Sequence, residues 1–286
     1  MAEKLGNSLL LPKIYINKKN MYFKQSTHQY IINDKPYTSF SSIIKLVEPE
    51  KDWDDIAAKY AKKHSTKKDP LTAEQVKKKW AEEGRVAREK GTLFHSLKEE
   101  EDKSSKDKPV FFTEFDGDIK PIKSLEELED GIHPELCLYN NEFQACGMTD
   151  RAIIETIDGI RYVTLEDFKT SKTIDLESFY DSRNQKYATL NAPLNHIMDC
   201  NFMKYSLQLS MYAFFLEKYG FTPRNLTINH LIIKKWDEEP PVSEPKYHIQ
   251  FENSKYYVAD EILYPVTYMK KEVKALLQYH KSKQRK

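Results

Sequence analysis

The chain has 286 residues, of which 40% are hydrophobic, and its formal net charge is +1. That length fits one medium domain with additions or two small domains, and the hydrophobic share is enough for a core. A charge this close to zero excludes a globally basic surface, so any nucleic-acid surface must be a local patch. The N-terminus has only a short apolar run, preceded by Glu3 and broken by Pro12, which predicts neither a signal peptide nor a membrane helix and therefore a cytoplasmic protein.

Aromatic and β-branched residues occur on both sides of an Asn-Asp pair within residues 21–37, which predicts a small β-hairpin. A short helix follows and is ended by Pro49. Three side chains near its start are candidate N-caps: Thr38, Ser39 and Ser41. The apolar spacing over residues 52–64 then predicts an amphipathic helix.

A capping box at Thr72 and Gln75 predicts the start of a long helix, which runs to the charged segment 101–130. Three residues at intervals of four share one face of this helix: Gly91, His95 and Glu99. A single histidine on a helix is more often packed or solvated than bound to a metal, so the spacing alone assigns it no role. The segment 101–130 is charged apart from three phenylalanines, and we interpret it as a surface insertion.

The pair Asp158-Gly159 separates two alternating, β-branched runs, which is the strongest short-range signal for a hairpin with a type I′ turn. Counting outward from the turn predicts four opposed pairs: Ile157 with Ile160, Ile154 with Val163, Ala152 with Leu165, and Asp150 with Asp167. Lys169 falls on the same face as the two aspartates. Because opposed like charges destabilise a sheet, the pattern favours a divalent cation between the carboxylates; an exposed hairpin end with solvated charges is the alternative.

The rest of the chain predicts four further elements: a helix over 202–219, a buried strand over 226–233, an edge strand over 247–251 that pairs with it, and a closing helix over 260–279. Gln208 and Tyr212 lie four residues apart on the first of these helices and share one face. Three cysteines lack metal-binding spacing and are predicted to be buried thiols: Cys137, Cys146 and Cys200.

Four motifs, in this order over residues 90–220, resemble those of the RecB-like branch of the PD-(D/E)XK nucleases. The motifs are GxxxH ending at His95, GxxD ending at Asp150, the triplet Asp167-Phe168-Lys169, and QxxxY formed by Gln208 and Tyr212. Thr149 stands where the family has a proline before its first aspartate. Similar chains include lambda exonuclease-like phage proteins and mitochondrial genome maintenance exonucleases.

The resemblance implies an α/β fold with a restriction-endonuclease-like core, in which helices flank a central mixed β-sheet. Residues 1–90 would then form an N-terminal hairpin and helical extension packed on that core. Residues 91–286 would form the nuclease core, with the charged insertion near 101–130.

The resemblance also implies the roles of individual residues. One or two Mg²⁺ or Mn²⁺ ions would be held by four groups: His95, Asp150, Asp167 and the backbone carbonyl of Phe168. The catalytic set would comprise Asp150, Asp167, Lys169, Gln208 and Tyr212, with Lys169 orienting the attacking water. Two carboxylates are further candidates for the site: Glu99 and Glu135. Three residues are expected to contact DNA: Thr170, Lys172 and Arg183. No iron–sulfur cluster is expected, because the chain lacks the four cysteines that would hold one.

The implied activity is that of a divalent-metal-dependent DNA nuclease. The resemblance favours an exonuclease that acts on single-stranded DNA or duplex ends in phage-type or viral-type replication, recombination or repair, within a bacterial or phage-infected cytoplasm. Replication or recombination proteins would be its partners, and no membrane would be involved. Two alternatives remain open: a catalytically silent DNA-binding or scaffolding subunit with the same fold, and a structure-specific endonuclease.

Overall fold

The computed structural model describes residues 21–24, 29–32, 35–66, 70–104 and 128–284 of the chain. Nine strands form one mixed sheet: β1 (Met21–Lys24), β2 (Gln29–Ile32), β3 (Lys35–Ser39), β4 (Gly131–Asn140), β5 (Ala145–Ile157), β6 (Ile160–Lys169), β9 (Thr222–Lys235), β10 (His248–Phe251) and β11 (Ser254–Pro265). Their order is β1-β2-β3-β5-β6-β9-β11-β10, with β4 paired to β5 outside this path. Two neighbouring pairs are parallel, β3 with β5 and β6 with β9, and the others are antiparallel.

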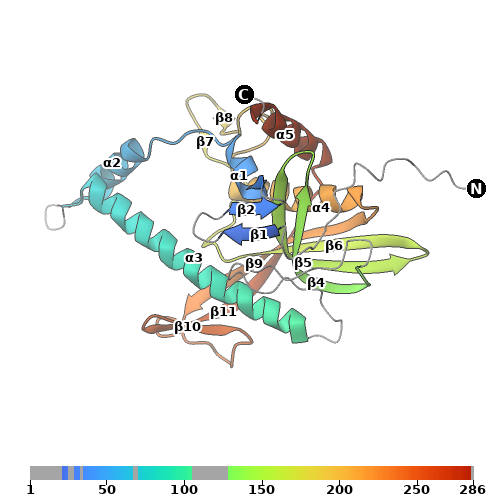
Figure 1. Cartoon of the computed structure of the whole chain (residues 1–286). Helices are drawn as coiled ribbons and strands as arrows, with labels where there is room; N and C mark the ends of the chain where they lie inside the picture. Colours follow the sequence, from blue (N-terminus) through green and yellow to red (C-terminus); the bar gives the residue numbers. More distant parts are fainter. Residues whose placement is uncertain (1–20, 25–28, 33–34, 67–69, 105–127, 285–286) are drawn as a thin grey trace, which may run out of the picture.

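Five helices of the described residues surround this sheet: α1 (Phe40–Lys45), α2 (Trp53–His64), α3 (Ala73–Ser104), α4 (Asn201–Lys218) and α5 (Lys270–Lys283). Helix α4 packs on one face of the sheet together with α1 and α5, and α3 runs along the other face (Figure 1). Helix α2 packs on the N-terminal half of α3, and this helix pair extends away from the sheet (Figure 1). The predicted class, a mixed α/β sheet flanked by helices, is therefore confirmed.

The capping signals in the sequence act as predicted. Ser39 is the N-cap of α1, where its hydroxyl accepts a hydrogen bond from the Ser42 amide. Thr72 and Gln75 form the reciprocal capping box: the Thr72 amide donates to Gln75 Oε1 at 2.8 Å, and the Gln75 amide donates to Thr72 Oγ1 at 3.2 Å. Helix α3 then continues for 32 residues, so it passes through the expected domain boundary at residues 90–91 without a break. No helix of the described residues has the length and apolarity needed to cross a membrane.

The predicted hairpin register is confirmed along the β5–β6 ladder, from Ile157–Ile160 at the turn to Arg151–Glu166 at its far end. Asp158 and Gly159 both have positive φ, 50° and 75°, as a type I′ turn requires. The ladder ends one pair short of the two aspartates. All three cysteines are free and buried, as predicted.

Two predictions for the C-terminal part are wrong. Strand β10 pairs with β11 and has no ladder with β9, because β11 lies between them. The first half of the predicted closing helix is strand β11, and the helix begins only at Lys270. Ile262 and Leu263 fit helical spacing, but they are 39% and 60% exposed, so no apolar helix face forms there. The available edge of β9 instead provides backbone partners along the whole segment. Two other predictions concern residues outside the described ranges: the Asn33-Asp34 turn and residues 105–127 of the charged insertion.

Candidate functional site

A change of partner along one edge of β5 creates the candidate site. Strand β4 occupies one edge of β5, so β3 and β6 share the other edge. Strand β3 pairs with residues 145–146 and β6 pairs from residue 151 onward, which leaves residues 147–150 without a ladder on that edge. A cavity of about 750 Å³ opens at this point, and α3 and α4 supply much of its wall. Backbone groups freed from the sheet and residues from eight elements therefore meet in one pocket.

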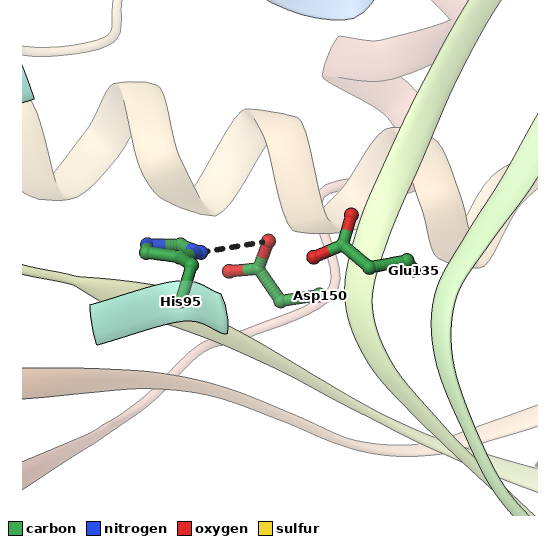
Figure 2. A group of neighbouring side chains, drawn as sticks. All are labelled: His95, Glu135 and Asp150. Carbon is green, nitrogen blue, oxygen red and sulfur yellow. Dashed lines mark ion pairs between the residues drawn. The ribbon is translucent and has the colours of Figure 1, made fainter. Parts of the chain in front are cut away.

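Three potential metal ligands converge in this pocket. His95 comes from α3, Glu135 from β4 and Asp150 from β5, and one ligand atom from each lies within 4.8 Å of the others. Figure 2 shows the imidazole and the two carboxylates directed toward one another, with His95 Nδ1 3.5 Å from Asp150 Oδ1. All three side chains are partly buried. One nitrogen and two carboxylate oxygens form a donor set that a hard divalent cation accepts.

Glu135 reaches the pocket through an unusual backbone conformation. The β4–β5 ladder pairs Pro134 with Arg151 and Leu136 with Thr149, and it omits Glu135 between them. The φ of Glu135 is 49°, in the left-handed region that non-glycine residues seldom adopt. Such a conformation costs about 1–3 kcal/mol and is concentrated at functional sites. The sequence offers only a weak signal for it, the Pro134 that precedes Glu135.

The second aspartate takes a different role from the first. Asp150 Oδ2 accepts a hydrogen bond from the Phe168 amide at 2.6 Å, which joins β5 to the end of β6. Asp167 is buried and forms an ion pair with Lys169. The Lys169 ammonium also lies 4.8 Å from the centre of the Tyr205 ring. Asp167 is thus outside the three-ligand cluster, where Glu135 stands in its predicted place.

The ionisation of these groups reflects crowding of negative charge. Burial, followed by the charge of Asp150, raises the pKa of Glu135 to about 8. Burial also raises the pKa of Asp167 to about 6, although the Lys169 charge opposes this shift. Burial alone would lower the pKa of His95, but the charge of Asp150 and its hydrogen bond together outweigh burial and raise that pKa to about 9. Likewise, burial would lower the pKa of Lys169, but the charges of Asp167 and Asp150 raise it above its ordinary value. The charge of His95 opposes the shift at Glu135 but does not cancel it.

The pKa of Asp150 moves the other way. Burial would raise it, but the charge of His95, the charge of Lys169 and the Phe168 amide together lower it. Asp150 is therefore the carboxylate of the cluster that stays ionised at neutral pH.

Helix α3 is held close to the end of β6 by one glycine and one aromatic ring. A Cβ at Gly91 would lie 2.8 Å from Thr170 Oγ1, so the absence of a side chain permits the approach. The Phe168 ring packs edge-on to His95, with ring centres 6.3 Å apart. It also belongs to a small apolar cluster with Phe94 of α3. The glycine of the GxxxH motif and the middle residue of the D-x-K motif thus both position His95.

A partly buried ion triad fixes the same helix to the two strands. Arg151 donates to both carboxylate oxygens of Asp102, at 2.6 and 2.7 Å, and to Glu166 at 2.8 Å. Asp102 lies two helical turns after His95, and Arg151 directly follows Asp150. The triad therefore links the helix that carries the histidine to the strand that carries the aspartate.

The QxxxY pair supports strand β5. The Tyr212 hydroxyl donates to the Met148 carbonyl at 2.6 Å, and Gln208 Nε2 donates to the Tyr212 hydroxyl at 3.0 Å. Both residues line the pocket, but Tyr212 is only 2% exposed. The phenol therefore contacts strand β5 two residues before Asp150.

The remaining predicted residues differ in their distance from the pocket. Glu99 and Thr170 line it. Lys172 is exposed and is not among the lining residues. Arg183 lies at the turn between two short strands, β7 (Tyr180–Asp181) and β8 (Lys186–Tyr187), where its amide donates to Asp181. The structure thus brings Thr170, and not the two cations, to the candidate site.

Comparison with known protein families, curated proteins and solved structures finds no match to this chain. The family resemblance therefore depends on the four motifs, and no comparison extends it to the geometry of the pocket. That geometry also adds a residue that the motifs do not contain: Arg88, on the pocket wall seven residues before His95. Its spacing of two helical turns from His95 was the available signal.

Proposed function

We propose that this chain is a divalent-metal-dependent deoxyribonuclease of the PD-(D/E)XK type, with a restriction-endonuclease-like fold, and that it acts as an exonuclease. The observation that carries the proposal is the convergence of His95, Glu135 and Asp150 in a pocket that Lys169 also lines. A phosphodiesterase of this kind needs oxygen and nitrogen ligands for a cation next to a fixed ammonium group. Each of these components comes from a different element of the fold.

The donor set fits Mn²⁺ or Mg²⁺. Carboxylate oxygens suit both ions, and the imidazole nitrogen favours Mn²⁺ over Mg²⁺. The raised pKa of Glu135 supports the same conclusion, because a carboxyl group that burial and Asp150 keep protonated would ionise beside a bound cation. His95, Glu135 and Asp150 would hold the ion, which supplies positive charge against the negative charge that develops on the phosphate.

The other side chains orient the reactants. The raised pKa of Lys169 keeps its ammonium protonated at neutral pH, so Lys169 positions water and balances charge but does not remove a proton. Asp167 fixes the ammonium through its ion pair. In the hydrolysis, the water oxygen bonds to phosphorus, one phosphorus–oxygen bond breaks, and the departing sugar oxygen leaves with a proton. DNA enters as the substrate, and the exonuclease assignment follows from the family resemblance.

Cleavage assays with purified protein test the proposal. Labelled linear single-stranded, linear duplex and circular single-stranded DNA are incubated with Mn²⁺ or Mg²⁺. We expect degradation of linear DNA, an intact circle, and losses of at least about 100-fold in Glu135→Gln and Lys169→Met. Glu155→Gln is the matched control, because Glu155 lies on β5 but is exposed and paired with Arg224.

Three outcomes would count against parts of this account. Linear DNA that stays intact for hours with both metals would overturn the nuclease activity and favour a silent DNA-binding subunit. If Lys169→Met cleaves DNA as well as the wild type, the candidate site does not carry out the cleavage. A cut circle would replace the exonuclease with an endonuclease.

A further inference from the structure

The pocket wall is electrically asymmetric. Glu99, Glu135 and Asp150 line its acidic part, next to His95. On the same face of α3, two helical turns before His95, Arg88 lines the wall. The acidic and cationic parts of the wall are thus separate along α3.

Arg88 and Lys169, two cations of the pocket wall, differ in their partners. Lys169 is paired with Asp167. Arg88, in contrast, has no ion-pair partner among the described residues, and it is exposed. The Arg88 Nη1 lies beside Gly84 of the same helix, at 3.3 Å from the position that a Cβ on Gly84 would take. The guanidinium therefore keeps its donors available for an anion that enters the pocket.

Arg85 provides the contrast within the same helix. Its guanidinium donates to Glu82, Glu89 and Glu252 at 2.6–3.0 Å, and these three carboxylates raise its pKa above the ordinary value. Arg85 and Arg88 lie one helical turn apart. Carboxylates neutralise the charge of Arg85, and no carboxylate of the described residues pairs with Arg88. Of the two, only Arg88 lines the pocket.

We propose that Arg88 binds a phosphate of the DNA backbone other than the one under attack. This inference rests on the proposed function. Seven residues of α-helix span about 10 Å, so Arg88 stands too far from His95 to contact the reacting phosphate at the metal cluster. Guanidinium groups bind phosphate oxygens through paired hydrogen bonds, and an uncompensated one adds the attraction of a full charge. A DNA strand that runs from the metal cluster along α3 would place a neighbouring phosphate at Arg88.

Salt-dependent binding tests this proposal without relying on cleavage. A fluorescein-labelled thymidine 12-mer is titrated with the full chain in EDTA, by fluorescence anisotropy, at several salt concentrations. We expect Arg88→Ala to weaken binding about 10-fold at low salt and to reduce the slope of log K against log [salt] by about 0.7, the value for one contact to a single strand. Arg88→Lys should keep the slope, and Arg85→Ala should bind within about 2-fold of the wild type. Thermal melts monitor folding of each variant.

Each result separates this proposal from the proposed function. If the wild type binds the oligonucleotide and Arg88→Ala binds equally well with an unchanged slope, the phosphate site is overturned and the nuclease proposal stands. Equal losses in Arg88→Ala and Arg85→Ala overturn it as well, because they show a general charge effect. If the predicted losses occur but no variant cleaves DNA with Mn²⁺, the phosphate site stands and the nuclease proposal fails. No binding by the wild type overturns the phosphate site, and the cleavage assays then decide the nuclease proposal by themselves.

Discussion

Glu135 is the residue on which the candidate metal centre depends most. It adopts a positive φ of 49°, sits opposite Asp150, and has its pKa raised to about 8 by burial and by that neighbouring charge. Each feature is unfavourable for the metal-free fold. The sequence ranked Glu135 only as a further candidate, because its place beside Asp150 depends on the β4–β5 pairing, which links residues 15 positions apart. Local pattern cannot reveal such a contact.

This reasoning predicts how pH affects the metal-free protein. The folded-state pKa of Glu135 exceeds its unfolded value of about 4.3, so its contribution to stability is complete below that value and is lost as pH rises toward 8. The melting temperature in EDTA should therefore be about 3–6 °C lower at pH 8.5 than at pH 6. This shift corresponds to a loss of about 1–2 kcal/mol in the free energy of unfolding after solvent screening. Mn²⁺ should stabilise more at pH 8.5, because the ligands must be deprotonated.

Glu135→Gln is the matched variant for this experiment, since it keeps the shape of the side chain and removes the charge. Its melting temperature in EDTA should change less between the two pH values. Exposed Glu155→Gln should follow the wild type. Equal pH responses of wild type and Glu135→Gln would contradict the assigned environment of Glu135.

At the scale of single elements, the packing of β5 against α1 depends on the first residue of the GxxD motif. A Cβ at Gly147 would lie 2.6 Å from the Phe40 ring, which is itself fully buried between Tyr212 and Phe215. The ring cannot move without disturbing the helix that carries the QxxxY pair. The motif glycine is thus explained by packing, while the motif aspartate three residues later is explained by the site.

Gly147→Ala should therefore destabilise the protein by about 1–3 kcal/mol, the usual cost of overpacking a core. Chemical denaturation measures the change. Gly84→Ala is the control: its Cβ would meet only the mobile end of Arg88, and alanine favours a helix over glycine by up to about 1 kcal/mol. A Gly147→Ala variant as stable as the wild type would show that Phe40 can repack.

Elements with strong local signals were predictable, and elements defined by distant partners were not. The Asp158-Gly159 turn fixed the hairpin register, and the Thr72-Gln75 box fixed the start of α3. Segment 260–266 carries apolar spacing that fits a helix as well as a strand, and only the available edge of β9 selects the strand. The same limit applies to Arg88, because only the three-dimensional structure shows that no carboxylate of the described residues pairs with it.

At the scale of the whole molecule, the site arises from the sheet topology. Strand β5 changes partner from β3 to β6 next to Asp150, and residues of α3 and α4 line the cavity at this point. No single segment of the sequence encodes this arrangement. The four motifs indicated which residues would meet, and the topology explains how they meet and why Glu135 joins them.

The central claim is that His95, Glu135 and Asp150 bind one divalent cation. Crystals of the protein soaked in Mn²⁺ and measured near the manganese absorption edge test it directly. We predict an anomalous difference peak within about 2.5 Å of a ligand atom from each of the three side chains, and its loss in crystals of Glu135→Gln. A pocket without such a peak, or a peak bound to other residues, would contradict the account.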